Sequence, residues 1–138
     1  RLMSRGLGDV YKRQGVYDKN KSELLLSNAG HEPPLIFSND RNFKTVDEAG
    51  PPLGIAPNFK FTEQVISFKE SSMYIFTDGI TEMKNTNGDM LGQEGFQDYI
   101  KKYQSTPNNK RLQKIIEDLI SSGRIQKDDL TIVTVDGK

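Results

Sequence analysis

Residues 73–79 read MYIFTDG, and this stretch of the chain decides the fold. The four consecutive apolar residues 73–76 predict a strand covered on both faces, because a half-buried strand would alternate apolar with polar side chains. Asp78 comes just after this strand, and Gly79 predicts a sharp turn, since glycine adopts backbone conformations that other residues avoid. The sequence therefore predicts a carboxylate presented at the end of a buried strand.

Shorter strands are predicted earlier in the chain. The segments 16–18 and 23–27 flank a polar turn cluster at 18–21, a pattern typical of a β-hairpin. Further strands are expected at 35–37, at 43–46 and at 61–68.

Two helices and a closing strand are predicted in the last third of the chain. Apolar residues recur at helical spacing over 96–103, which indicates an amphipathic helix. In a second helix, Thr106 is expected as the N-cap, Pro107 as the first helical residue and Gly123 as the C-terminal stop. The β-branched segment 130–135 predicts a final strand.

This order of elements predicts an α+β fold, with two helices on a mostly antiparallel sheet. Helices on one side leave the apolar residues of the other side without cover within this chain. We therefore expect part of a larger domain, with its N-terminal portion missing, marginal stability and exposed apolar surface.

The composition excludes several classes of protein. The chain has 138 residues, no cysteine, and 19 basic against 19 acidic side chains. It can therefore form no disulfide, thiolate zinc site or cysteine nucleophile, and it has no basic excess for nucleic acid. No apolar stretch approaches the roughly 20 residues of a membrane-spanning helix, so a cytoplasmic setting without direct membrane contact is expected. Any metal must bind oxygen ligands or the single histidine, His31.

The N-terminal residues 4–14 read SRGLGDVYKRQ, which resembles the translation of a transposase-type sequencing-library adapter. We therefore treat Arg1–Gln14 as an artefactual segment and expect the natural sequence to begin near Gly15, as the C-terminal part of a longer protein. A genuine basic N-terminal arm is the alternative.

Two acidic positions are the first candidates for chemistry. Asp78 follows the predicted strand 73–76, and Asp128-Asp129 stands just before the final strand. Two strand-end carboxylates that meet at one edge of a sheet would suit Mg²⁺ or Mn²⁺, which bind through oxygen and need only one or two carboxylates besides waters. On spacing alone, a plain turn or helix-cap role for these aspartates is the alternative.

Two further polar residues are candidates near such a site. His31 lies in a rigid turn before two prolines, where its imidazole could face a substrate or simply bond the backbone. Glu82 follows Asp78 by four residues and could reach a metal through a water, or could be a solvated carboxylate.

Four motifs, taken in order, resemble the SpoIIE/RsbU-type branch of the metal-dependent PPM serine/threonine phosphatases of bacteria. They are LLLSNAGHEPPLIF (24–37), GPPLGI (50–55), MYIFTDGITEMKNTNGDMLG (73–92) and KDDLTIVTV (127–135). The resemblance covers residues 15 to about 136, which correspond to the C-terminal half to two-thirds of such a domain. It implies part of a four-layer αββα sandwich of the PPM-phosphatase type.

The resemblance also implies a two-metal Mn²⁺ or Mg²⁺ centre, with Asp78 and Asp128 among its ligands and Gly79, Asp129, His31 and Glu82 near it. In the family, a metal-activated water hydrolyses a phosphoserine or phosphothreonine. The early aspartate motifs that bridge the metals are missing from this sequence, so the fragment as given is expected to be inactive.

The expected partner is a phosphorylated regulatory protein of the anti-anti-sigma type, and an upstream sensor domain is expected in the parent protein. A non-catalytic binding module with a phosphatase-like fold is the alternative function. Retention of both Asp78 and Asp128 favours the enzyme, since a binding module has no physical need for two converging acids.

Overall fold

The computed structural model describes residues 10–137. Within them, the chain forms two antiparallel sheets and three helices. The elements are β1 (Lys12–Asp18), β2 (Glu23–Ala29), β3 (Leu35–Ser38), β4 (Phe43–Lys44), β5 (Gln64–Ser67), β6 (Ser71–Phe76), α1 (Asp78–Thr81), α2 (Gly92–Tyr103), α3 (Asn108–Ser121) and β7 (Ile132–Asp136).

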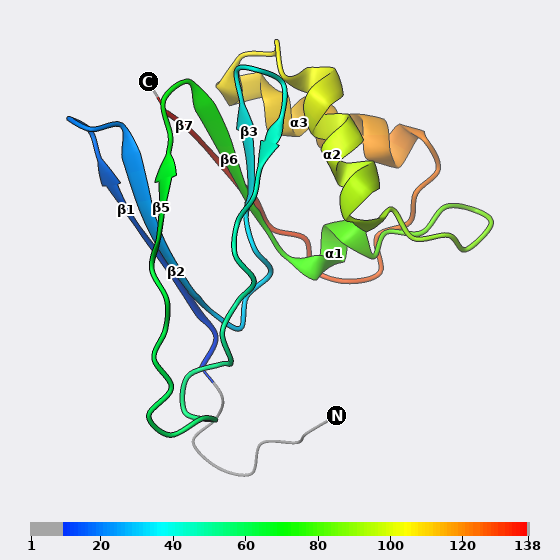
Figure 1. Cartoon of the computed structure of the whole chain (residues 1–138). Coiled ribbons are helices and arrows are strands. Elements are labelled where there is room, and N and C mark those ends of the chain that lie inside the picture. Colours follow the sequence, from blue (N-terminus) through cyan, green and yellow to red (C-terminus); the bar gives the residue numbers. More distant parts are fainter. Residues whose placement is uncertain (1–9, 138) are drawn as a thin grey trace.

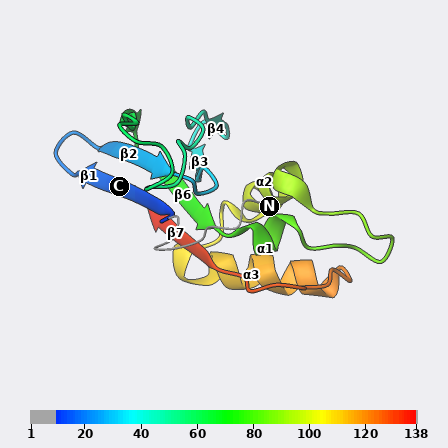
Figure 2. The ribbon, with the colours of Figure 1, turned by 90° about the horizontal axis from the view of Figure 1, so that it is seen from below.

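The elements form three layers (Figure 1). One sheet has the strand order β1-β2-β5 and the other the order β4-β3-β6-β7, and every pairing between these strands is antiparallel. The helices cover the face of the second sheet that points away from the first, as the view from below shows (Figure 2). The α+β fold predicted from the sequence is therefore confirmed.

Apolar side chains fill both spaces between the layers. The core between the two sheets consists of Leu24, Leu26, Ile36, Ile66, Phe68 and Met73. The core between the second sheet and the helices consists of Leu35, Phe37, Tyr74, Phe76, Ile80, Met83, Leu91, Phe96, Ile100, Ile115 and Leu119.

Strand β6 contributes to both cores, which explains its continuous apolar sequence. Met73 and Ile75 pack between the sheets, whereas Tyr74 and Phe76 pack against the helices. Successive side chains of a strand point to opposite faces, so a strand in the middle layer must be apolar throughout. The prediction from residues 73–76 is confirmed.

Several boundaries differ from the prediction by a few residues, among them strand β4, which covers only residues 43–44 of the predicted 43–46. Strand β1 begins at Lys12, because the register set by the hairpin continues the ladder backwards, and backbone pairing depends little on side chains. Strand β5 covers only residues 64–67 of the predicted 61–68. Helix α3 begins at Asn108, with Pro107 as its N-cap at a ψ of 142°. A residue before proline avoids the helical region, so Thr106 does not lead directly into the helix.

The outer face of the sheet β1-β2-β5 is exposed. Val16, Leu25 and Val65 are directly paired across its three strands and point away from the core. Val16 is 56% and Val65 61% exposed. The expected exposed apolar surface is confirmed, and the second helical layer of an αββα sandwich is not present among the described residues 10–137.

No helix in residues 10–137 has the length and apolar character to cross a membrane.

A buried arginine, Arg111, joins the N-terminal end of α3 to the edge of the second sheet. The guanidinium Nη1 of Arg111 donates to Ser72 Oγ and Tyr74 Oη, each at 3.2 Å, and to Asp136 Oδ1 at 3.0 Å. Its Nε donates to the carbonyl oxygen of Thr106 at 3.1 Å. Burial raises the pKa of the Tyr74 hydroxyl, which therefore stays protonated and accepts from the arginine with its oxygen.

Arg111→Met is expected to lower the free energy of unfolding by about 2 kcal/mol, because it leaves buried acceptors without their donor. Chemical denaturation followed by circular dichroism measures the loss. The neighbouring exposed Lys110→Met serves as the matched control and should change stability by less than about 0.5 kcal/mol. Equal stability of the two variants would show that the network contributes nothing.

Candidate functional site

The candidate site lies where β6 ends, beside the segment that leads into β7. Two hydrogen bonds hold these segments together. The backbone N–H of Thr77 donates to the carbonyl oxygen of Thr131, and the N–H of Thr131 donates to Thr77 Oγ1, each at 3.1 Å. Asp78 follows immediately as the first residue of α1 and is exposed. The predicted carboxylate at the end of a buried strand is therefore present.

Gly79 is needed here for a reason other than the predicted one. It lies inside α1 and does not have a positive φ, so it makes no sharp turn. A Cβ atom at this position would lie 2.3 Å from the carbonyl oxygen of Asp129. Glycine therefore permits a close backbone approach between the end of β6 and the segment before β7.

Asp78 borders a pocket of about 340 Å³, to which Tyr11 and Arg13 of the segment 1–14 also contribute. Its walls include Thr77 and Thr131 from the joined strand ends, and His31 and Glu32 from the connection between β2 and β3. The structure thus brings two candidates from distant parts of the sequence, Asp78 and His31, to one cavity.

The loop that carries His31 is held by a buried asparagine. The side-chain amide of Asn28 donates to the carbonyl oxygen of His31 at 2.7 Å, and Asn28 Oδ1 accepts from the N–H of His31 at 3.2 Å. The imidazole lies against the ring of Tyr11, with 6.0 Å between the ring centroids. The two Asn28 hydrogen bonds fix the backbone at His31 at the wall of the pocket, independently of Tyr11, which belongs to the segment 1–14.

Asp128 and Asp129 lie on the adjoining surface rather than in the Asp78 pocket. Asp128 Oδ1 accepts from the N–H of Asp129 at 2.8 Å, and the carbonyl oxygen of Asp128 accepts from Gln126 Nε2 at 3.0 Å. Both aspartates line a separate open hollow. The contact between Gly79 and Asp129 nevertheless makes the two hollows neighbours.

The donor set fits part of a hard-cation site. Asp78 and Asp128 are exposed carboxylates on adjoining segments, which is the ligand chemistry that Mg²⁺ and Mn²⁺ require. Residues 10–137 contain no group of three or more histidine, cysteine, aspartate or glutamate residues that could hold a metal ion. The described residues therefore offer two exposed carboxylates and no complete cluster of metal-ligating side chains.

Glu82 does not border the Asp78 pocket. It is the C-cap of α1, and its backbone N–H donates to the carbonyl oxygen of Asp78 at 2.9 Å.

The sequence analysis did not predict that Thr131 and Glu32 line the Asp78 pocket. The pairing of β6 with β7 brings Thr131 to the Asp78 pocket, and no local sequence pattern indicates such a contact.

Comparison with known families explains the motif order. The family described as Stage II sporulation protein E (SpoIIE) matches residues 14–138, which is most of the chain. The chain belongs to the SpoIIE family. The resemblance to the SpoIIE/RsbU-type branch of the PPM phosphatases, noted from four motifs, is confirmed.

Two curated relatives of this SpoIIE-family chain are similar over most of its length. The Synechocystis protein IcfG is 30% identical over 124 residues, which are 88% of this chain and 19% of IcfG. The phosphoserine phosphatase RsbU of Bacillus subtilis is 26% identical over 122 residues, which are 86% of this chain and 36% of RsbU. The chain thus spans about a fifth to a third of the length of these relatives.

A solved structure shows the same fold. The RsbU and RsbW domains of a Mycobacterium tuberculosis protein match with a TM-score of 0.74 at 23% identity. The match covers 93% of this chain and 36% of that one. The fold predicted from the resemblance, part of a PPM-type phosphatase domain, is therefore confirmed.

Proposed function

We propose that this chain is the C-terminal part of a metal-dependent serine/threonine phosphatase domain, within a longer protein whose earlier residues complete the metal site. One observation carries the proposal. The hydrogen-bonded strand ends at Thr77 and Thr131 place Asp78 and Asp128 on adjoining segments, and Gly79 allows the close approach between them.

In this proposal, Asp78 and Asp128 are ligands of Mn²⁺ or Mg²⁺. The bound cations would activate a water for attack on the phosphoryl group and spread the charge of in-line displacement. Asp129 holds Asp128 through its backbone N–H, and its own carbonyl oxygen packs against Gly79. His31 stands at the wall where the phosphorylated side chain would enter, and no proton-transfer role is assigned to it.

The proposed substrate is a phosphoserine or phosphothreonine on a cytoplasmic regulatory protein of the anti-anti-sigma type. The similarity to a phosphoserine phosphatase supports the phosphorylated residue. A sensor domain upstream in the parent protein is part of the same proposal. The share of the relatives that this chain leaves uncovered provides room for such a domain.

We also propose that residues 1–14 derive from a sequencing adapter and that the natural sequence begins near Gly15. The family match supports this boundary because it starts at Gln14. A long read of the source DNA across the junction tests it. A reading frame that continues upstream without the adapter sequence is expected. The same codons for residues 4–14 in the native gene would instead establish a genuine N-terminal arm.

Calorimetric titration of the longer protein with Mn²⁺ tests the enzyme proposal. Two binding sites are expected, because the upstream residues should add the ligands that residues 10–137 lack. Residues 15–138 alone should bind Mn²⁺ weakly. Absence of Mn²⁺ binding by the longer protein would contradict the proposal and favour a non-catalytic binding module with a phosphatase-like fold.

A further inference from the structure

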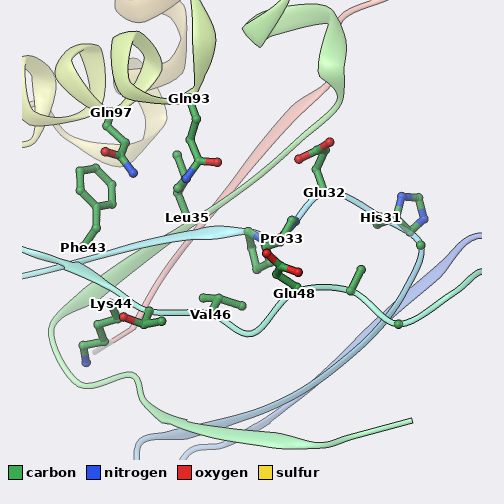
Figure 3. A pocket seen from close by; sticks show the side chains of 15 residues that line it. His31, Glu32, Pro33, Leu35, Phe43, Lys44, Val46, Glu48, Gln93 and Gln97 are labelled. Atoms are coloured by element: carbon green, nitrogen blue, oxygen red, sulfur yellow. The ribbon is translucent and has the colours of Figure 1, made fainter. Parts of the chain in front are cut away.

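A second pocket, of about 760 Å³, adjoins the Asp78 pocket. The two share the wall formed by Gly30, His31 and Glu32. The larger pocket runs from this wall along β3 and β4 to α2 (Figure 3), and we call it the β3–β4 groove. A segment lying in the groove could therefore continue directly into the proposed catalytic pocket.

Two prolines open the β3–β4 groove. The ladder between β3 and β4 stops after the pair Ile36–Lys44, and the next backbone bridge of this segment joins Gly50 to Ala29 of β2. Between these points the chain carries Pro33-Pro34, which have no N–H to donate. No backbone hydrogen bond joins residues 30–34 to 45–49 in the part of the chain that the structure describes.

The segment opposite the prolines retains free backbone groups. Gln64 from β5 bonds this segment from the other sheet, because its side chain donates to the carbonyl oxygen of Thr45 and accepts from the N–H of Asp47. Val46 and Glu48 have no backbone hydrogen-bond partner among residues 10–137. Unpaired backbone that continues from the end of a strand can pair with an added extended segment.

Side chains above the groove are suited to an extended peptide. Gln93 and Gln97 reach down from α2 toward Leu35 and Phe43 (Figure 3). Both glutamine amides border the groove and can donate to and accept from the backbone of a bound segment. The groove is apolar on the side of β3 and β4 and polar on the side of α2, which suits a bound strand whose side chains alternate between apolar and polar.

Two glutamates lie at the end of the groove next to Asp78, and the one cation beside them among the described residues, Arg13, belongs to the segment 1–14 and donates from Nη1 to the carbonyl oxygen of Glu32. Glu32 and Glu48 lie there, near the shared wall (Figure 3). The two nearby lysines, Lys44 and Lys101, contact groups other than these glutamates. Lys44 Nζ donates to the carbonyl oxygen of Ser67, and Lys101 Nζ lies 5.7 Å from the ring centroid of Phe43 at the far end.

We propose that the β3–β4 groove binds an extended segment of the phosphoprotein substrate, beside its phosphorylated residue. The segment pairs with the free backbone of Val46 and Glu48, and a basic side chain near the phosphoserine faces Glu32 and Glu48. This inference rests on the proposed function, since it assigns sequence selectivity to the same phosphatase site.

The test uses the longer protein with Mn²⁺ and alanine-based phosphoserine peptides. Each peptide carries one lysine or one glutamate within about three residues of the phosphoserine, a distance that the groove can span. The readout is the ratio of kcat/KM for each lysine peptide to that for its glutamate counterpart. A ratio within one enzyme cancels any general change in stability or metal content.

At one position or more, the lysine peptide is expected to be hydrolysed about fivefold faster than the glutamate peptide. Glu48→Lys should invert this preference. Glu63→Lys makes the same charge change on an exposed residue outside the groove and should leave the ratio as it is. The three enzymes together separate a local effect of the groove from an effect of net charge.

A preference that is equal in the natural protein, Glu48→Lys and Glu63→Lys would overturn the groove proposal. Hydrolysis of para-nitrophenyl phosphate by the natural protein keeps this failure distinct from failure of the proposed function. If the small ester is hydrolysed and the peptide ratios do not respond to Glu48→Lys, only the groove assignment falls. If neither kind of substrate is hydrolysed, the phosphatase proposal falls and the groove assignment falls with it.

Discussion

Asp78→Asn is expected to lower kcat/KM of the longer protein for phosphoserine peptides by about a hundredfold or more. The amide has nearly the shape of the carboxylate but no negative charge, and a neutral oxygen is a weak ligand for Mn²⁺. Because Asp78 is exposed at the start of α1, its replacement should leave the free energy of unfolding almost unchanged. Phosphate release and Mn²⁺ calorimetry on the same preparation measure both effects.

Asp98→Asn is the matched control for this experiment. Asp98 is an exposed carboxylate on α2 whose nearest charged partner is Lys101 at 3.8 Å, and it lies outside both pockets. It should retain full activity and Mn²⁺ affinity. Equal activity of Asp78→Asn and Asp98→Asn would show that Asp78 is not a metal ligand.

Gly79→Ala is expected to lower the free energy of unfolding by about 3 kcal/mol and to abolish tight Mn²⁺ binding. The added Cβ would lie 2.3 Å from the carbonyl oxygen of Asp129, so one of the two backbones must move. That movement separates the segments that carry Asp78 and Asp128. Chemical denaturation reports the stability, and calorimetry reports the metal affinity.

Gly15→Ala provides the comparison for this variant. Gly15 lies in β1, and an added Cβ would meet Leu24 Cδ1 at 3.4 Å, an ordinary contact with a side chain that can adjust. Its stability should change by less than about 0.5 kcal/mol. If Gly79→Ala were as stable as Gly15→Ala and bound Mn²⁺ normally, the close approach would have no role in the site.

Much of the fold could be predicted because its signals are local. The apolar run of β6 predicted a strand covered on both faces, and the helical spacing over residues 96–103 predicted α2. The exposed row on the first sheet was expected because the chain has helices for one side only. Each of these inferences depends on periodicity, which the sequence records directly.

Features that depend on pairing between distant segments could not be predicted in the same way. The role of Gly79 depends on Asp129, fifty residues later, and Thr131 enters the site through the pairing of β7. The β3–β4 groove exists because Pro33-Pro34 stand opposite Asp47 and Val46, a register that follows only from the ladder. Sequence spacing placed Asp78 and Asp128 near one sheet edge but did not show that separate hollows hold them.

Phosphate release from a phosphoserine peptide by the longer protein, measured as Mn²⁺ is added to the chelator-treated enzyme, tests the metal-dependent phosphatase assignment. No release is expected without metal, and the activity that appears with Mn²⁺ should be lost again in Asp78→Asn. Release that is independent of metal, or no release at saturating Mn²⁺ from a well-folded longer protein, would contradict the assignment of this chain to a metal-dependent phosphatase.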